Sequence, residues 1–181
     1  SYIGQIYFAQ NDYSKALDYF KKSLKLDLSF FGENHPSVAS GYYNIGYVYF
    51  AQGDYSKALE YFEEVLKIRL SVYGENHSQV SSIYDHIGEI YFAQKDYSKA
   101  LYYFEESLKI RLSLFGENHP EVALSYYSIG SLYIIQGDKS KALNYYEKSL
   151  KIRLSVYGEN HPLTKEIMDL INVANSKVLQ S

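Results

Sequence analysis

The segment Tyr55–His77, YSKALEYFEEVLKIRLSVYGENH, determines the fold because close copies of it recur along the chain. The copies begin at Tyr13 (YSKALDYFKKSLKLDLSFFGENH), Tyr97 (YSKALYYFEESLKIRLSLFGENH) and Lys139 (KSKALNYYEKSLKIRLSVYGENH). Consecutive copies start 42 residues apart, with no insertion between them. A fixed period of this length is the signature of a repeat array, in which each unit packs mainly against its neighbours. The sequence therefore predicts a solenoid rather than a single globular domain.

Each unit contains two helical patterns separated by a turn. The first, over residues 38–52, carries no charged residue and is aromatic around much of its circumference, so it must be buried or held against a partner. The second runs from about residue 55 to residue 72, and its apolar residues recur at helical spacing: Ala58, Leu59, Phe62, Leu66 and Leu70. Its solvated face is expected to carry Lys57, Glu60, Glu63, Glu64, Lys67 and Arg69.

The residues between these patterns predict where the helices begin and end. Asp54 is a good N-cap for the second helix, and Gly74 is placed as a C′ glycine that can adopt a positive φ. Pro36 fits the first helical position, which places His35 at the cap. The equivalent histidines lie one repeat apart, so we interpret them as caps rather than as ligands of one metal ion: His77, His119 and His161.

A glycine recurs in the middle of each first helix, at positions 4, 46, 88 and 130, and an alanine follows twelve residues later each time. Because a mid-helix glycine costs about 1 kcal/mol relative to alanine, its recurrence needs a packing reason. We expect each glycine to face its alanine, as Gly46 would face Ala58, and to let the two helices of a hairpin approach closely.

The composition excludes several classes of protein. Lysine and arginine number 18 against 21 acidic residues, the net charge is −3 and there is no basic tract, so a nucleic-acid partner is disfavoured. No apolar run approaches the roughly 18 residues of a membrane span, and the start has no signal-peptide pattern, so no membrane partner is expected. The absence of cysteine excludes disulfides and cysteine-ligated metals. We expect no metal or other cofactor; the compartment stays open, with the cytoplasm favoured.

The pattern aromatic–x–x–Ile–Gly–x–x–Tyr, followed by alanine and then by an aromatic residue four positions on, resembles the tetratricopeptide repeat. The pattern occurs three times: as Tyr42-Ile45-Gly46-Tyr49-Ala58-Phe62, as Tyr84-Ile87-Gly88-Tyr91-Ala100-Phe104 and as Tyr126-Ile129-Gly130-Tyr133-Ala142-Tyr146. The 42-residue unit, with its longer second helix and its Gly-x-x-His-Pro linker, resembles the kinesin light chain type. The resemblance implies an all-α, right-handed superhelical solenoid of helix-turn-helix hairpins, whose first helices line a concave groove.

On this basis the chain divides into a first repeat with a truncated first helix (1–35), three further repeats (36–77, 78–119 and 120–161) and a C-terminal capping helix (162–181). In the last segment Asn172 and Asn175 stand where the repeat glycine and tyrosine would fall, while one apolar face remains: Ile167, Leu170, Ile171 and Ala174. Such a helix solvates the end of a stack. Because the chain begins inside a first helix, and no capping helix precedes the first hairpin, we expect it to be an excised segment of a longer protein.

The resemblance assigns fourteen first-helix positions to the groove: Gln5, Phe8, Tyr43, Asn44, Tyr47, Phe50, Asp85, His86, Glu89, Phe92, Tyr127, Ser128, Ser131 and Ile134. Tyrosine offers a large contact area at low entropy cost, and groove exposure is expected for Tyr43, Tyr47 and Tyr127. The tyrosines that belong to the repeat pattern are instead expected to pack between hairpins: Tyr49, Tyr91 and Tyr133.

The groove positions also predict the chemistry of a ligand. Kinesin light chains have an asparagine before the apolar–small pair, where it can hold a peptide backbone; Asn44 matches it, and the equivalent positions hold Tyr2, His86 and Ser128. No groove position is cationic, which disfavours a clamp for the C-terminal carboxylates of chaperones. Asp85 and Glu89 make the middle repeat acidic, which favours a neutral or basic peptide.

The sequence thus predicts a non-catalytic module that binds a peptide or protein segment in the groove. The alternative is a structural or self-associating scaffold segment, because near-identical units with an uncapped first hairpin can stack end to end. An enzyme is disfavoured, and no catalytic residue is assigned: His86 lies beside Asp85 and Glu89 but lacks a nucleophile and a glycine loop.

Overall fold

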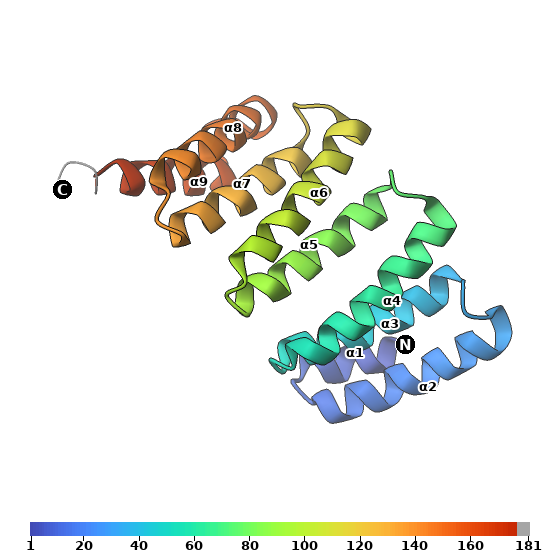
Figure 1. The fold of residues 1–181 in the computed structure, drawn as a ribbon. Helices are drawn as coiled ribbons and strands as arrows, with labels where there is room; N and C mark the ends of the chain where they lie inside the picture. The colour runs from blue at the N-terminus through green and yellow to red at the C-terminus, as the bar shows by residue number, and fades with distance from the viewer. Residues whose placement is uncertain (177–181) are drawn as a thin grey trace.

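In a computed structural model, which describes residues 1–176, the chain forms nine α-helices joined by short turns (Figure 1). They are α1 (Tyr2–Ala9), α2 (Tyr13–Phe31), α3 (Pro36–Ala51), α4 (Tyr55–Tyr73), α5 (Ser78–Ala93), α6 (Tyr97–Phe115), α7 (Pro120–Ile135), α8 (Lys139–Tyr157) and α9 (Pro162–Ser176). The hairpins α1–α2, α3–α4, α5–α6 and α7–α8 pack one on the next, and α9 packs on α8. The prediction of an all-α repeat solenoid is confirmed. Residues 177–181 of the predicted capping helix lie outside the described residues.

The helices begin at the predicted caps. The Asp54 side chain accepts a hydrogen bond from the Lys57 backbone N–H at 3.3 Å, and Asp12, Asp96 and Asp138 do the same in their units. His35 Nδ1 accepts from the Ser37 N–H at 3.2 Å, and α3 begins at Pro36. The capping role of the other three repeat histidines is confirmed by the same bond: His77, His119 and His161.

The second helices bury a wider face than the apolar spacing indicates. In α4, Ala58 and Phe62 are buried as expected, while Leu66 is only half-buried. Val65 and Ile68, which the predicted stripe omits, are buried too. They are buried because α4 packs on both α3 and α5, and a helix between two neighbours needs an apolar surface toward each.

The repeat glycines make room mainly for an aromatic residue of the second helix; only at Gly130, among the four, would an added Cβ also approach the predicted alanine, at 3.3 Å from Ala142 O. A Cβ on Gly88 would lie 2.7 Å from Phe104 Cε1, and one on Gly4 would lie 2.6 Å from Phe20 Cε1. At Gly46 the nearest atom would be Tyr61 Cβ, at 3.0 Å. The close approach of the two helices is therefore set by the ring on the second helix, four residues after the alanine.

The tyrosines of the repeat pattern pack within each hairpin. Their rings stack on a tyrosine of the second helix with centroids 5.5–5.7 Å apart: Tyr49 on Tyr61, Tyr91 on Tyr103 and Tyr133 on Tyr145. They pack rather than face the groove, as predicted, and the ring on which each one stacks belongs to the same hairpin. None of the helices in residues 1–176 combines the length and apolar character that crossing a bilayer requires.

Candidate functional site

The predicted groove residues gather around two hollows on the first helices. The N-terminal hollow, of about 220 Å³, is lined by Gln5, Phe8, Phe20, Tyr43, Asn44 and Tyr47. The central hollow, of about 500 Å³, is lined by Phe50, Glu89, Phe92, Ala93, Phe104, Tyr127, Ser128 and Ser131. The predicted residues that line neither hollow are Asp85, His86 and Ile134.

Sequence reasoning missed three lining residues. Phe20 and Phe104 come from second helices and reach the hollows beside the repeat glycines, where a Cβ on Gly4 or Gly88 would collide with their rings. The spacing of glycine and aromatic residue could have revealed both. Ala93 at the end of α5 gave no such signal.

A chain of hydrogen bonds joins the walls of the two hollows. The Tyr43 hydroxyl lies 3.0 Å from His86 Nε2, and His86 Nδ1 lies 3.2 Å from Glu89 Oε2. Because an ionised carboxylate can only accept, Nδ1 donates to Glu89, and in the neutral ring Nε2 then accepts from Tyr43. Burial raises the pKa of the Tyr43 hydroxyl, so that this group keeps the proton it donates. We call this chain the Tyr43–His86–Glu89 bridge.

Aromatic contacts hold the bridge in place. The His86 ring is stacked on Phe62 with centroids 5.6 Å apart, and Tyr43 lies 5.3 Å from the His86 ring. Tyr43 also stacks on Tyr47 at 6.0 Å, and Tyr47 contacts Phe8 of α1 at 5.4 Å. The predicted groove residues are therefore in contact with one another from α1 through α3 to α5.

Three arginines at one repeat position support the groove from the second helices. Arg69 lies 5.8 Å from the centre of the Tyr43 ring and donates to the Gln79 carbonyl at 2.8 Å. Arg69 was predicted to lie on the solvated face, and this was wrong, since it is half-buried between α3 and α5. Arginine recurs at the same repeat position as Arg111 and Arg153, and this recurrence could have indicated that a specific contact holds the side chain.

Arg111 changes the expected electrostatics of the middle repeat. Its Nη2 lies 2.6 Å from Asp85 and 3.0 Å from Glu121, and the Asp85 side chain is only 19% exposed. Burial raises the pKa of Asp85, although the charge of Arg111 opposes this shift. Asp85 therefore does not offer the free carboxylate that the sequence predicted. Glu89, half of whose side chain is exposed, remains as the accessible acidic group.

Tyr127, the third tyrosine that was predicted to face the groove, contacts α8 and α9. The Tyr127 hydroxyl donates to Glu166 of α9 at 3.1 Å, and Arg153 lies 5.0 Å from the centre of its ring. Arg153 in turn donates to the Leu163 carbonyl of α9. These contacts connect α9 to both helices of the preceding hairpin.

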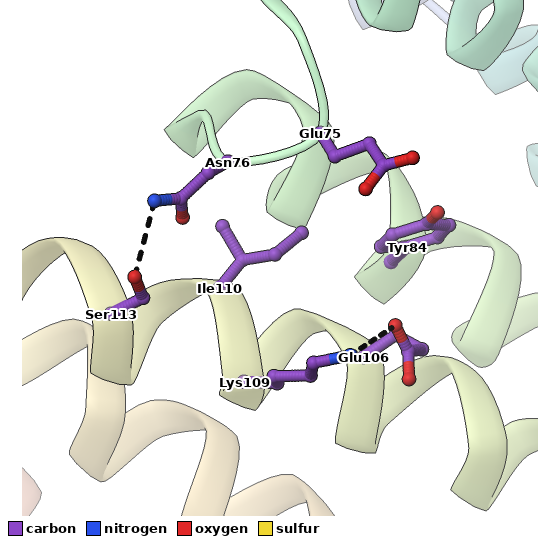
Figure 2. A pocket seen from close by; sticks show the side chains of 7 residues that line it. All are labelled: Glu75, Asn76, Tyr84, Glu106, Lys109, Ile110 and Ser113. Atoms are coloured by element: carbon purple, nitrogen blue, oxygen red, sulfur yellow. Dashed lines mark hydrogen bonds and ion pairs between the residues drawn. The ribbon is translucent and has the colours of Figure 1, made fainter.

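A third hollow, of about 310 Å³, lies away from the groove, between the α4–α5 turn and α6, and is shown in Figure 2. Two pairs of its polar side chains contact each other: Asn76 donates to Ser113 Oγ at 3.1 Å, and Lys109 lies 3.8 Å from Glu106 (Figure 2). Asparagine and serine recur at the same positions in neighbouring units, so this hollow is interpreted as a joint between repeats.

The family model described as Tetratricopeptide repeat matches residues 1–71, 38–113 and 79–155. The chain therefore belongs to the tetratricopeptide repeat family, as its repeat pattern indicated. Proteins of this family usually bind proteins or peptides and are generally non-catalytic.

Solved structures share the fold. BtubC (BKLC) from P. vanneervenii is 25% identical with a TM-score of 0.78 over 88% of this chain, which spans 63% of BtubC. A putative kinesin light chain from Podospora anserina with nearly identical TPR-like repeats is 16% identical with a TM-score of 0.75, over 99% of this chain and 94% of that one. The apo form of RapI is 19% identical with a TM-score of 0.80, over 99% of this chain and 62% of RapI. The kinesin light chain-like repeat type is thereby confirmed. No curated protein matches the sequence.

Proposed function

We propose that the chain is a non-catalytic interaction module that binds an extended peptide or protein segment along the groove. The observation that carries this proposal is the pair of hollows on the first helices, joined by the Tyr43–His86–Glu89 bridge. We also propose repeat boundaries at residues 36, 78, 120 and 162, where α3, α5, α7 and α9 begin.

The side chains of the groove suit a peptide. Phe8 and Tyr47 provide apolar surface in the N-terminal hollow, while the amides of Gln5 and Asn44 can donate to and accept from an extended backbone. In the central hollow the Ser128 hydroxyl has the same capacity beside the aromatic rings, whereas Ser131 Oγ already donates to the Tyr127 carbonyl at 2.9 Å. Concave, mostly apolar surfaces with a few polar groups are typical of ligand sites.

This proposal assigns no catalytic role to His86. Its ring nitrogens lie at hydrogen-bond distance from the Tyr43 hydroxyl and from Glu89, and its face is covered by Phe62. Within residues 1–176 no serine or threonine hydroxyl lies at hydrogen-bond distance from the ring, so His86 activates no nucleophile of that kind. The proposal therefore includes no catalytic residue, and neither a nucleic acid nor a membrane as the partner.

Peptides selected from a phage-displayed library on the purified chain would test the groove. We expect the selected peptides, measured by titration calorimetry, to lose most of their affinity for the variant Asn44→Ala/Tyr47→Ala/Phe92→Ala. Tyr43 is left intact in this variant because it packs on Phe62 and His86. The matched control is Tyr102→Ala, which removes an exposed ring from α6 outside the groove.

Both variants must keep the helicity and the melting temperature of the parent chain. Equal affinity of the selected peptides for the parent and for the groove variant would refute the proposed site. Loss of affinity in Tyr102→Ala alone would place the binding surface on the second helices.

A scaffold role through end-to-end association is the second candidate, because hairpins of closely similar sequence already pack one on the next within the chain. Sedimentation over a concentration series tests this role, since a monomer at high concentration excludes it.

A further inference from the structure

We infer that the central hollow selects a segment in which a bulky apolar side chain stands next to a lysine or arginine. This inference rests on the proposed peptide-binding function and names the chemical class of its ligand. It follows from the lining of the hollow, from the charge at its edge and from the positions of the nearby arginines.

The apolar part of the recognition comes from four aromatic rings. Phe50, Phe92 and Phe104 reach the hollow from α3, α5 and α6, and Tyr127 lines it from α7, so four elements surround one space of about 500 Å³. Aromatic rings in such a space prefer large apolar or aromatic side chains, which bury the greatest area against them.

The charged part comes from Glu89, the one carboxylate among the residues that line this hollow, which include no lysine, arginine or histidine. Its side chain is 50% exposed, and one carboxylate oxygen, Oε2, contacts His86. Oε1 makes no hydrogen bond within residues 1–176. A ligand that enters the hollow therefore meets an accessible carboxylate oxygen beside an aromatic wall.

The arginines beneath the groove do not neutralise this carboxylate. Arg111 pairs with Asp85 and Glu121 and is 4% exposed, while Arg69 donates to the Gln79 carbonyl. In the described part of the chain, His86 is the only basic side chain within ion-pair distance of Glu89. A cation on the ligand would form a charge-assisted bond to Oε1, whereas an anion there would be repelled.

Four synthetic peptide mixtures test the inference directly. Each has the form X3-Phe-Z-X3, with Z as lysine, glutamine or glutamate, and a fourth has the form X3-Gly-Lys-X3; X is any uncharged residue except cysteine. Retention of the purified chain on each immobilised mixture is measured at low and at high salt. We expect the Phe-Lys mixture to bind about fivefold better than Phe-Glu, a ratio typical of one partly exposed ion pair, and high salt to reduce this ratio.

Two variants assign the preference to a residue. Glu89→Gln should bring the retention on Phe-Lys and Phe-Glu to the same level while keeping the preference for phenylalanine over glycine, and Glu89→Lys should reverse the charge preference. The matched control, Glu105→Gln, removes an exposed carboxylate from α6 and should leave the ratio unchanged.

The outcomes separate this inference from the proposed function. Equal retention on Phe-Lys and Phe-Glu by the parent chain, or a preference that survives in Glu89→Gln, overturns the inference while groove binding stands. Retention that is unchanged in the groove variant Asn44→Ala/Tyr47→Ala/Phe92→Ala overturns the proposed function as well.

Discussion

The guanidinium of Arg111 lies 2.6 Å from the carboxylate of Asp85, and both groups are withdrawn from solvent. Asp85 belongs to α5 and Arg111 to α6, while the second acidic partner, Glu121, belongs to α7 at 3.0 Å. One buried cation thus connects two consecutive hairpins. Arg69, at the same repeat position, has no carboxylate within pairing distance among residues 1–176 and donates to a backbone carbonyl instead.

Replacing Arg111 with methionine should destabilise the fold by about 3 kcal/mol, because Asp85 then stays buried without its counter-ion. Arg69→Met is the matched control and should cost only about 1 kcal/mol, since it loses a neutral partner. Urea unfolding of both variants and of Arg111→Met/Asp85→Asn measures the difference. If the double variant is no more stable than Arg111→Met, the ion pair is not the cause of the loss.

The stability of the chain should also depend on the protonation of Asp85. Burial raises the pKa of Asp85 in the folded state above its unfolded value, so folding favours the protonated form. The stabilisation that the protonated Asp85 carboxyl contributes is fully present below the unfolded pKa of about 3.9. It is lost as the pH rises through the pKa of the folded state.

Relative to Asp85→Asn, which does not titrate, the parent chain should therefore become less stable between pH 4 and pH 7. Urea midpoints of the two proteins over this range give the measurement. A parent chain that instead gains stability over Asp85→Asn as the pH rises would show that Arg111 outweighs burial.

The packing of the repeat glycine against the ring predicts the effect of Gly88→Ala. A Cβ would lie 2.7 Å from the Phe104 ring, and the overlap should outweigh the roughly 1 kcal/mol that alanine gains in a helix. We expect a net loss of about 1–2 kcal/mol in urea unfolding. Gly88→Ala/Phe104→Leu should lose less than the sum of the two single variants. Strict additivity would mean that the methyl group and the ring do not meet.

Removing the hydroxyl of Tyr43 tests the Tyr43–His86–Glu89 bridge. Tyr43→Phe leaves His86 Nε2 without its donor and should cost about 1 kcal/mol. The ¹⁵N shift of His86 Nε2, the nitrogen that accepts from Tyr43, should change in the variant, while Nδ1 keeps the proton that it donates to Glu89. The control is Tyr84→Phe, whose hydroxyl makes no hydrogen bond within the described chain. Identical His86 spectra in the parent and in Tyr43→Phe would contradict the bridge.

The sequence by itself determined the features that depend on local spacing. The 42-residue period predicted the repeat array. The cap residues Asp54 and His35 and the position of Pro36 each predicted a helix boundary that the structure confirms. The groove positions came from the family resemblance, and most of them surround the two hollows.

Only the tertiary structure decided which groups from different helices meet. The pattern of α5 alone predicts Asp85 to be an exposed acid, but α6 places Arg111 beside it. The pattern of α4 alone predicts Arg69 to be solvated, but Arg69 contacts Tyr43 of α3 and the Gln79 carbonyl of α5. Gly88 faces Phe104 rather than the alanine because the register of the two helices places the ring there. The energy of an ion pair or a close contact depends on distance in space, and helical periodicity specifies only the face of one helix on which a residue lies.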